Sequence, residues 1–147
     1  MGVNYLDERR YDTGDVIFTE GEAGSEMFIV QEGTVVITKK VAGRDVFVAA
    51  LVRGDFFGEM ALLNSQPRHA TCIALAPTTL LAIRSGELLM KLRRDPTFAL
   101  EMLQQMSRRI SFLEEQVAGL MEHELASRQE LARILARSEY RLREDQR

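Results

Sequence analysis

Short apolar runs alternate with turn residues along the first half of the chain. From Val16 to about Arg84 these runs read VIFTE, MFIV, TVVIT, DVFVAAL, ATCIAL and TLLAIR, and glycines stand between many of them. Runs of this length, separated this often by turn residues, are typical of the strands of an antiparallel sandwich or barrel. We therefore predict a mainly β domain over this part of the chain.

The pattern becomes helical near Ser85, which can cap a helix over residues 86–94. Asp95 followed by Pro96 is a second start signal, because an acidic cap often precedes a proline at the first helical position. After that proline, Gly119 is the one helix breaker in the sequence. We expect a long helical segment to follow Pro96.

These patterns divide the chain into two units. Residues 1–95 form the predicted β domain, and residues 96–147 form the C-terminal helical segment. An apolar stripe over about residues 100–121 advances in steps of three and four, at Leu103, Met106, Ile110, Leu113, Val117 and Leu120. Such steps are typical of a coiled-coil seam or of a long amphipathic helix.

The stripe lapses through the polar sequence EHELASRQE and resumes near residues 131–135. Either one very long helix continues through this interruption, or a second helix begins around Ser127. A helix can bury such a stripe against its own β domain, but a seam of roughly 25 residues at ~1.5 Å per residue outruns a domain of this size. We predict a homodimer that pairs through the stripe, with residues 125–147 available for a protein partner or for further self-association.

Composition and charge narrow the possible functions. The chain has 147 residues and a formal net charge of -3, which gives no general attraction to nucleic acid or to an anionic membrane. No window reaches the ~20 apolar residues of a membrane span, and no signal peptide is visible. The single cysteine, Cys72, lies in an apolar run and is predicted to be a buried thiol. We expect a cytoplasmic protein that does not bind membranes.

The densest chemistry lies in the sequence GDFFGEMALLNSQPRHAT, residues 54–71. Gly58 lets the backbone turn, and Glu59–Leu63 has the composition of a short helical turn whose first N–H groups have no internal partner. Such amides attract an anion, most often phosphate. Arg68 follows Pro67, and its guanidinium can fork two phosphate oxygens.

Glu59 limits which anion would fit. A carboxylate beside an anion site repels the anion unless it offsets a cation or accepts a hydrogen bond from a neutral part of the same ligand. A ligand with a phosphate next to a sugar hydroxyl would satisfy both Glu59 and Arg68. The plainer alternative is a salt bridge between the two, with the glutamate stabilising the helix dipole. The order of these residues behind a glycine-punctuated β domain favours a ligand site.

The segment FGEMALLNSQPRHAT resembles the phosphate-binding cassette of cyclic nucleotide-binding domains, as in bacterial catabolite activators, cyclic-nucleotide-dependent kinases and cyclic-nucleotide-gated channels. Upstream, residues 14–15, residues 20–21 and the run MFIVQEGTVVI resemble the family's first strands and turns. Downstream, DPTFALEMLQQMSRRISFLEEQVAGL is similar to the long dimerisation helix of the activators. The resemblance covers about residues 13–120. It implies an antiparallel, jelly-roll-like β-roll (a double-stranded β-helix) with a short cassette helix and a long C-terminal helix.

The resemblance also implies roles for individual residues. Glu59 would accept the ribose 2′-hydroxyl, Arg68 would pair with the cyclic phosphate, and backbone amides of the cassette helix would surround that phosphate. The implied ligand-binding residues are Gly58, Glu59, Met60, Ala61, Arg68, His69 and Ala70. Further residues would line the base and ribose, namely Ile37, Val48, Leu51 and, on the long helix, Leu113. Arg109 would be able to reach Glu59.

Some features depart from the family's pattern. His69 stands where the family commonly has Ala, Ser or Thr, and Leu113 and Glu114 stand where the activators place hydroxyl residues against adenine. The preferred purine is therefore not indicated. The sequence also shows neither the family's usual N-terminal helices nor the winged helix-turn-helix of the activators, so we expect no DNA binding by this chain alone.

We expect a non-catalytic sensor: a homodimer that binds cyclic AMP or cyclic GMP, without a metal, and relays occupancy through its helix. One alternative is a degenerate module that holds two chains together without nucleotide, and another is the truncated ligand-binding half of a transcription regulator. Catalysis is disfavoured because the two histidines, His69 and His123, lie in unrelated segments, and neither Ser65 nor Cys72 has an evident base.

Overall fold

The computed structural model describes residues 7–146. Residues 1–6 and Arg147, which are the outer ends of the two predicted units, lie outside the described residues. The chain separates into two compact units, the first ending at Met102 and the second beginning at Leu103. The two units are therefore described one at a time.

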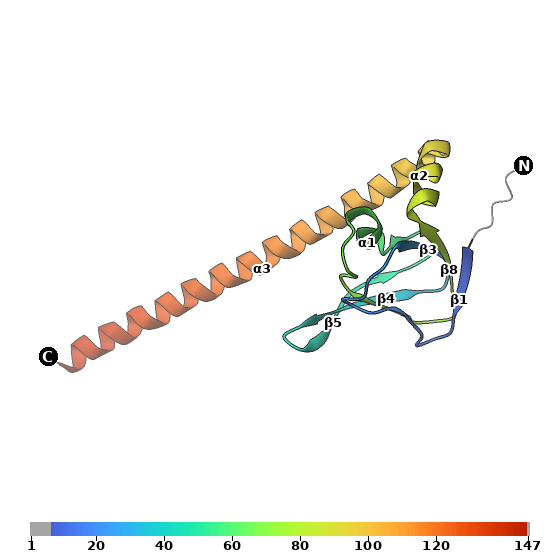
Figure 1. Cartoon of the computed structure of the whole chain (residues 1–147). Coiled ribbons are helices and arrows are strands. Elements are labelled where there is room, and N and C mark those ends of the chain that lie inside the picture. The colour runs from blue at the N-terminus through green and yellow to red at the C-terminus, as the bar shows by residue number, and fades with distance from the viewer. Residues whose placement is uncertain (1–6, 147) are drawn as a thin grey trace, which may run out of the picture. The chain divides into compact units, whose positions relative to one another are not determined.

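The first unit contains two four-stranded antiparallel sheets (Figure 1). The first sheet has the order β1 (Asp7–Tyr11), β8 (Thr78–Arg84), β3 (Glu26–Glu32), β6 (Phe56–Phe57). The second has the order β2 (Val16–Phe18), β7 (Thr71–Ala74), β4 (Val35–Val41), β5 (Arg44–Leu51). This arrangement confirms the predicted antiparallel β-roll.

The core contains residues from both sheets. Phe18 of β2, Phe28 of β3 and Phe57 of β6 form a cluster in which neighbouring ring centroids lie 5.3 to 6.1 Å apart. Val35 and Leu80 are fully buried in the same core. Because Phe18 belongs to the second sheet and the other two rings belong to the first, the aromatic cluster ties the sheets together.

Two strands are not indicated by the sequence pattern. β1 reads DERRY and carries almost no apolar signal, yet it pairs with β8 from Asp7↔Ala82 to Tyr11↔Thr78. β6 is only two residues long and lies directly before the cassette. Both strands are specified by their partners in the sheet more than by their own sequences.

Two helices follow the strands of the first unit. The cassette helix α1 (Glu59–Asn64) forms where the sequence predicts it. α2 (Ser85–Arg94) begins one residue earlier than expected, so the prediction of Ser85 as its N-cap is wrong. Arg84 takes that place, and its backbone N–H donates to the Glu87 carboxylate at 3.3 Å.

α3 (Pro96–Asp145) is one helix, so the polar interruption does not break it and no new helix begins near Ser127. Its start agrees with the predicted cap, since the Phe98 amide donates to the Asp95 carboxylate at 3.0 Å. An ion pair between Arg128 and Glu124, 2.6 Å apart, spans one turn within the polar stretch.

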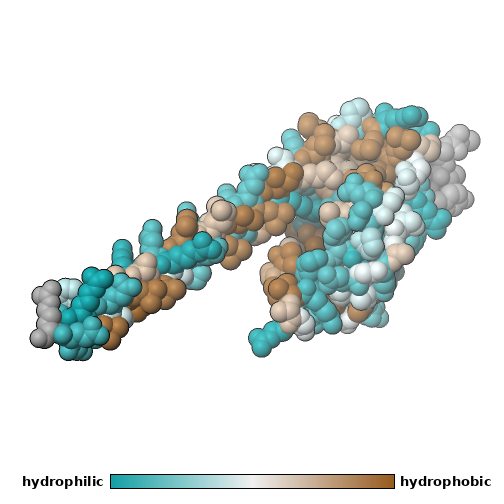
Figure 2. Space-filling view, turned by 60° about the vertical axis from the view of Figure 1, so that its left-hand side comes forward, coloured by the Kyte–Doolittle hydropathy of each residue, from teal (hydrophilic) through white to brown (hydrophobic). Residues whose placement is uncertain are grey.

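The part of α3 in the second unit exposes its apolar stripe in the single chain. Figure 2 shows apolar side chains along the helix, and the predicted seam residues among them are exposed at Leu103, Ile110, Leu113, Val117 and Leu120. Among residues 7–146, no helix has both the length and the apolar content that a membrane span requires.

Candidate functional site

Arg68 is the one charged side chain that is buried within the described part of the chain, with 7% of its surface exposed. Arginine is rarely buried without partners, because removing its charge from water is costly. Burial accordingly lowers the pKa of the Arg68 guanidinium, although arginine stays protonated at neutral pH. A buried cation of this kind requires electron-rich groups around it.

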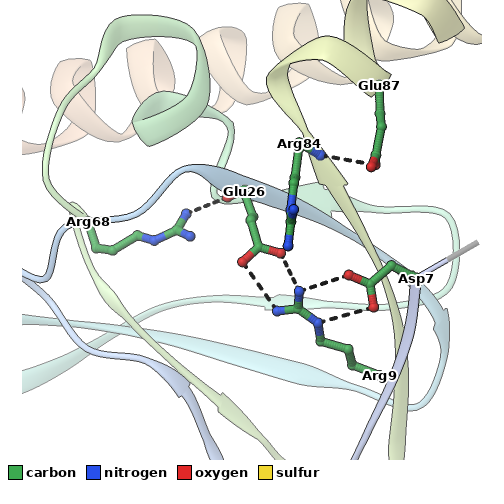
Figure 3. A network of polar contacts seen from close by, with 6 residues as sticks. All are labelled: Asp7, Arg9, Glu26, Arg68, Arg84 and Glu87. Atoms are coloured by element: carbon green, nitrogen blue, oxygen red, sulfur yellow. Dashed lines mark hydrogen bonds and ion pairs between the residues drawn. The ribbon is translucent and has the colours of Figure 1, made fainter.

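The guanidinium has such groups on two sides. Its Nη1 donates to the backbone carbonyl oxygens of Glu26, at 2.8 Å, and Gly58, at 3.1 Å; Figure 3 shows the bond to Glu26. Its Cζ lies 4.1 Å from the ring centroid of Phe18, which is a cation–π contact. These bonds run to carbonyl oxygens, so they do not support the alternative of an ordinary salt bridge between Arg68 and Glu59.

The other edge of the guanidinium, formed by Nε and Nη2, lies against Gly24. In residues 7–146, the hydrogen bonds of Arg68's side chain leave from Nη1, and no fully buried side-chain nitrogen lacks a partner. The Nε and Nη2 donors are therefore not fully enclosed, and the residue next to them, Gly24, has no side chain to cover them. Two parallel N–H groups of this kind match two oxygens of a phosphate or carboxylate.

Two glycines allow the protein to approach the guanidinium closely. A Cβ atom on Gly24 would lie 2.6 Å from Nη2, and one on Gly58 would lie 2.7 Å from Nη1, both closer than real contacts allow. Gly58 also has a φ of 77°, a left-handed conformation that other residues rarely adopt. The sequence motif identifies Gly58, but nothing distinguishes Gly24 from the other turn glycines in the sequence.

The backbone of Arg68 is also fixed. Its N–H donates to the carbonyl of Glu22, and its carbonyl accepts from the N–H of Gly21, both at 2.8 Å. Three residues further on, the Thr71 hydroxyl accepts from the N–H of Glu20 at 3.0 Å. The turn over residues 20–24 therefore acts as a template for the segment that carries the arginine.

The cassette helix presents the start of its backbone beside this arginine. Gly58 is its N-cap residue and makes no side-chain capping bond, while the half-buried Glu59 occupies the first turn. Ala61 is buried and Met60 is exposed. The structure thus brings Gly58 directly against Arg68, and the following residues continue from that contact into α1.

The remaining predicted site residues are more scattered. His69 is exposed and Ala70 is half-buried. Ile37 is half-buried against the core and Leu51 is buried within it, whereas Val48 is exposed on β5. Leu113 and Arg109 belong to the second unit. A role for these residues in ligand binding stays a prediction.

A charged network supports the strand that holds the arginine (Figure 3). Arg9 of β1 pairs with the carboxylate of Asp7 at 2.9 Å and also with the carboxylate of Glu26, whose carbonyl receives Nη1 of Arg68. The hydrogen bond from Arg9 lowers the pKa of Asp7. The sequence gives no sign of this network, because it depends on the pairing of β1 with β8 and of β8 with β3.

Possible metal ligands and the thiol of Cys72 bear on what chemistry the site can perform. Among residues 7–146, no three His, Cys, Asp or Glu side chains gather where they could hold a metal ion. Cys72 is buried as predicted, and burial raises the pKa of its thiol to about 12, so it is not a ready nucleophile. The arrangement around Arg68 is suited to binding an anion.

Comparison with known proteins identifies relatives that are similar to this chain in sequence. The cAMP-dependent protein kinase regulatory subunit of Mycosarcoma maydis is 45% identical over 73 residues, which are 50% of this chain and 14% of that protein. The cyclic AMP receptor protein of Thermus thermophilus is 32% identical over 111 residues, which are 75% of this chain and 51% of that protein. The chain thus spans at most about half the length of these relatives.

Solved structures share the fold. The crystal structure of the Thermus thermophilus catabolite activator protein has a TM-score of 0.71 and 31% identity, covering 79% of this chain and 55% of that one. The EAL enzyme Bd1971 in its cAMP-bound form has a TM-score of 0.56 and 27% identity, covering 74% of this chain and 30% of that one. Finally, the family model described as cyclic nucleotide-binding domain matches residues 8–95. The chain therefore belongs to the cyclic nucleotide-binding domain family.

Proposed function

We propose that this chain is a non-catalytic sensor that binds cyclic AMP or cyclic GMP at Arg68. The observation that carries the proposal is the buried guanidinium, held through Nη1 with its Nε–Nη2 edge accessible, inside the segment that matches the family. A cyclic phosphate offers two non-bridging oxygens to that edge. The backbone amides at the start of α1 would supply further donors.

Glu59 would accept a hydrogen bond from the ribose 2′-hydroxyl, and the exposed His69 and half-buried Ala70 would border the phosphate. Related structures carry either nucleotide, since Bd1971 has been solved in cAMP-bound and cGMP-bound forms. No contact among the described residues selects one purine. We therefore propose a cyclic purine nucleotide as the ligand class, with no metal required.

The relay of occupancy would use α3. Its exposed stripe in the second unit suits pairing of two copies, which supports a homodimer. A nucleotide can shift such an assembly only if it binds two arrangements of the helix with different affinity. Residues 125–147 would contact a partner protein. The protein would act in the cytoplasm.

A thermal-shift series tests this proposal against the nucleotide-free scaffold. The chain is heated with cyclic AMP, cyclic GMP, and linear AMP and GMP. A ligand at 100 times its dissociation constant stabilises by ~2.7 kcal/mol, which raises Tm by about 5 to 10 °C in a chain of this size. We expect that shift with a cyclic nucleotide and not with the linear ones. A Tm that neither cyclic nucleotide changes would favour the alternative of a nucleotide-free scaffold.

A further inference from the structure

An ion pair between Lys39 and Glu20, outside the cassette helix, contacts the loop that carries Arg68. Lys39 of β4 donates from Nζ to the backbone carbonyl of His69 at 2.7 Å, and the same Nζ lies 3.3 Å from a carboxylate oxygen of Glu20. The other oxygen of Glu20 accepts from the backbone N–H of Lys40 at 3.0 Å. The hydrogen bond from Lys40 lowers the pKa of Glu20, so this carboxylate is charged at neutral pH.

These contacts lie in a part of the loop that precedes the hydrogen-bonded pairing of β7 with β4. β7 begins only at Thr71, so His69 and Ala70 precede the strand's ladder. Arg68 itself is held by the turn that contains Gly21 and Glu22, and Glu20 is the residue on which that turn begins. Lys39 thus connects the template turn, through Glu20, with the loop, through the carbonyl of His69.

We propose that the Glu20–Lys39 pair is a positioning device for the ligand-binding arginine. It holds the backbone on both sides of the Arg68 contact, so that the Nε–Nη2 edge is already oriented before a ligand arrives. Preorganisation of this kind reduces the ordering that binding requires and therefore slows dissociation more than it speeds association. This role rests on the proposed nucleotide-binding function for one of its two readouts.

The first readout needs no ligand. The amides of Arg68 and Gly21 exchange hydrogen when the loop separates from the template turn, because each donates across that junction. Lys39→Met keeps the aliphatic stem but removes the charge and the donor. We expect this variant to exchange both amides roughly threefold to tenfold faster, the size of effect that a surface ion pair and one hydrogen bond give together. Glu20→Gln should act in the same direction.

The second readout is nucleotide kinetics by stopped flow with cyclic AMP and cyclic GMP. Lys39→Met should raise the dissociation rate by a similar factor and leave the association rate within about twofold. Lys39→Arg, which keeps a cation and a donor, should restore the parent's rates. Lys40→Met is the matched control, because it removes the same charge from the next position, whose contact with Glu20 runs through the backbone.

The possible outcomes separate the two claims. Equal effects of Lys39→Met and Lys40→Met would mean that charge alone matters, and unchanged amide exchange in Lys39→Met would mean that the pair does not hold the loop; either result overturns the positioning role. A parent protein that binds neither cyclic nucleotide would overturn the proposed function. In that case the exchange rates alone would still decide whether the pair positions Arg68.

Discussion

Three groups from separate parts of the chain hold the guanidinium of Arg68. The carbonyl of Glu26 belongs to β3, the carbonyl of Gly58 precedes α1, and the ring of Phe18 belongs to β2. The two carbonyls fix Nη1, and the ring limits the tilt of the guanidinium plane. An arginine with this many restraints loses little conformational freedom when an anion binds its remaining edge.

Gly24 lies so close to the guanidinium of Arg68 that a side chain at this position would displace it. Gly24→Ala would place a Cβ atom within 2.6 Å of Nη2, so the guanidinium must move and its alignment with a phosphate is lost. We expect nucleotide affinity to fall at least tenfold in calorimetric titration, the scale of one misaligned charged hydrogen bond. Gly86→Ala is the control, because nothing lies within 4 Å of its added Cβ. Equal affinity in the two variants would contradict the assigned contact.

Cys72 provides a test of burial near the site. With a pKa of about 12, only about 10⁻⁴ of the thiol is ionised at pH 8, against roughly a quarter for a free cysteine. Since the folded pKa is raised, the neutral thiol's contribution to stability is complete below the unfolded pKa and is lost as pH rises toward 12. We expect a thiol reagent such as DTNB to react about a thousandfold more slowly with the folded chain than with the urea-unfolded chain.

A similar rate in both states would show that Cys72 is accessible. The same measurement on an Arg68→Ala variant would report how the arginine affects the reactivity of the thiol. The charge of Arg68 is the main nearby interaction that favours ionisation of Cys72.

At this scale, the sequence is informative only where contacts are local. Gly58, Glu59 and Arg68 lie within one short motif, so their chemistry can be related by spacing alone. Gly24 lies against the same arginine and Lys39 contacts the residue after it, His69, from other turns and strands, and no local pattern reports such contacts. Their roles follow from the antiparallel register, which single-sequence reasoning does not supply.

At the scale of elements, the β4–β5 hairpin has an unusual turn. Val41 pairs with Arg44, and the two residues between them, Ala42 and Gly43, have φ values of 51° and 76°. A two-residue turn with both φ values positive suits the twist of a hairpin, but alanine is strained in this conformation. Ala42, at the first turn position, is therefore in a backbone conformation that suits glycine better.

We expect Ala42→Gly to stabilise the chain by about 0.5 to 1 kcal/mol, because relief of the left-handed strain exceeds the added entropy of an unfolded glycine. Urea unfolding would measure the change. Ala50→Gly, at an exposed position within β5, should instead destabilise by a similar amount. Destabilisation by both substitutions would contradict the turn assignment.

The elements also differ in how well their sequences predict them. The strands with apolar runs and the helix after Pro96 are recognisable, since burial or helical periodicity marks them. β1 is not, because its residues are polar and mostly exposed, and it exists through its pairing with β8. The choice between one and two C-terminal helices could not be made, because the polar stretch removes the stripe without removing helix-forming residues.

At the scale of the whole molecule, dimerisation through α3 is the main consequence still to be tested. Ile110→Glu places a charge in the middle of the exposed apolar stripe, and a buried pair of like charges would weaken association strongly. We expect the dimer dissociation constant to rise at least a hundredfold in sedimentation equilibrium. Ser111→Glu, next to it in the helix, carries the same charge outside the stripe and should leave the constant within a few fold.

A parent chain that sediments as a monomer at high micromolar concentration would contradict this pairing, and so would equal effects of the two variants. The stripe would then need another partner.

Calorimetric titration of the parent chain and of Arg68→Ala with cyclic AMP and cyclic GMP tests the central claim most directly. The parent should bind at least one nucleotide, and Arg68→Ala should lose about 2 to 5 kcal/mol of binding free energy, because a phosphate charge is left without its partner. Arg53→Ala, which removes an exposed arginine from the same unit, should bind as the parent does. Binding by Arg68→Ala with the parent's affinity would contradict the account.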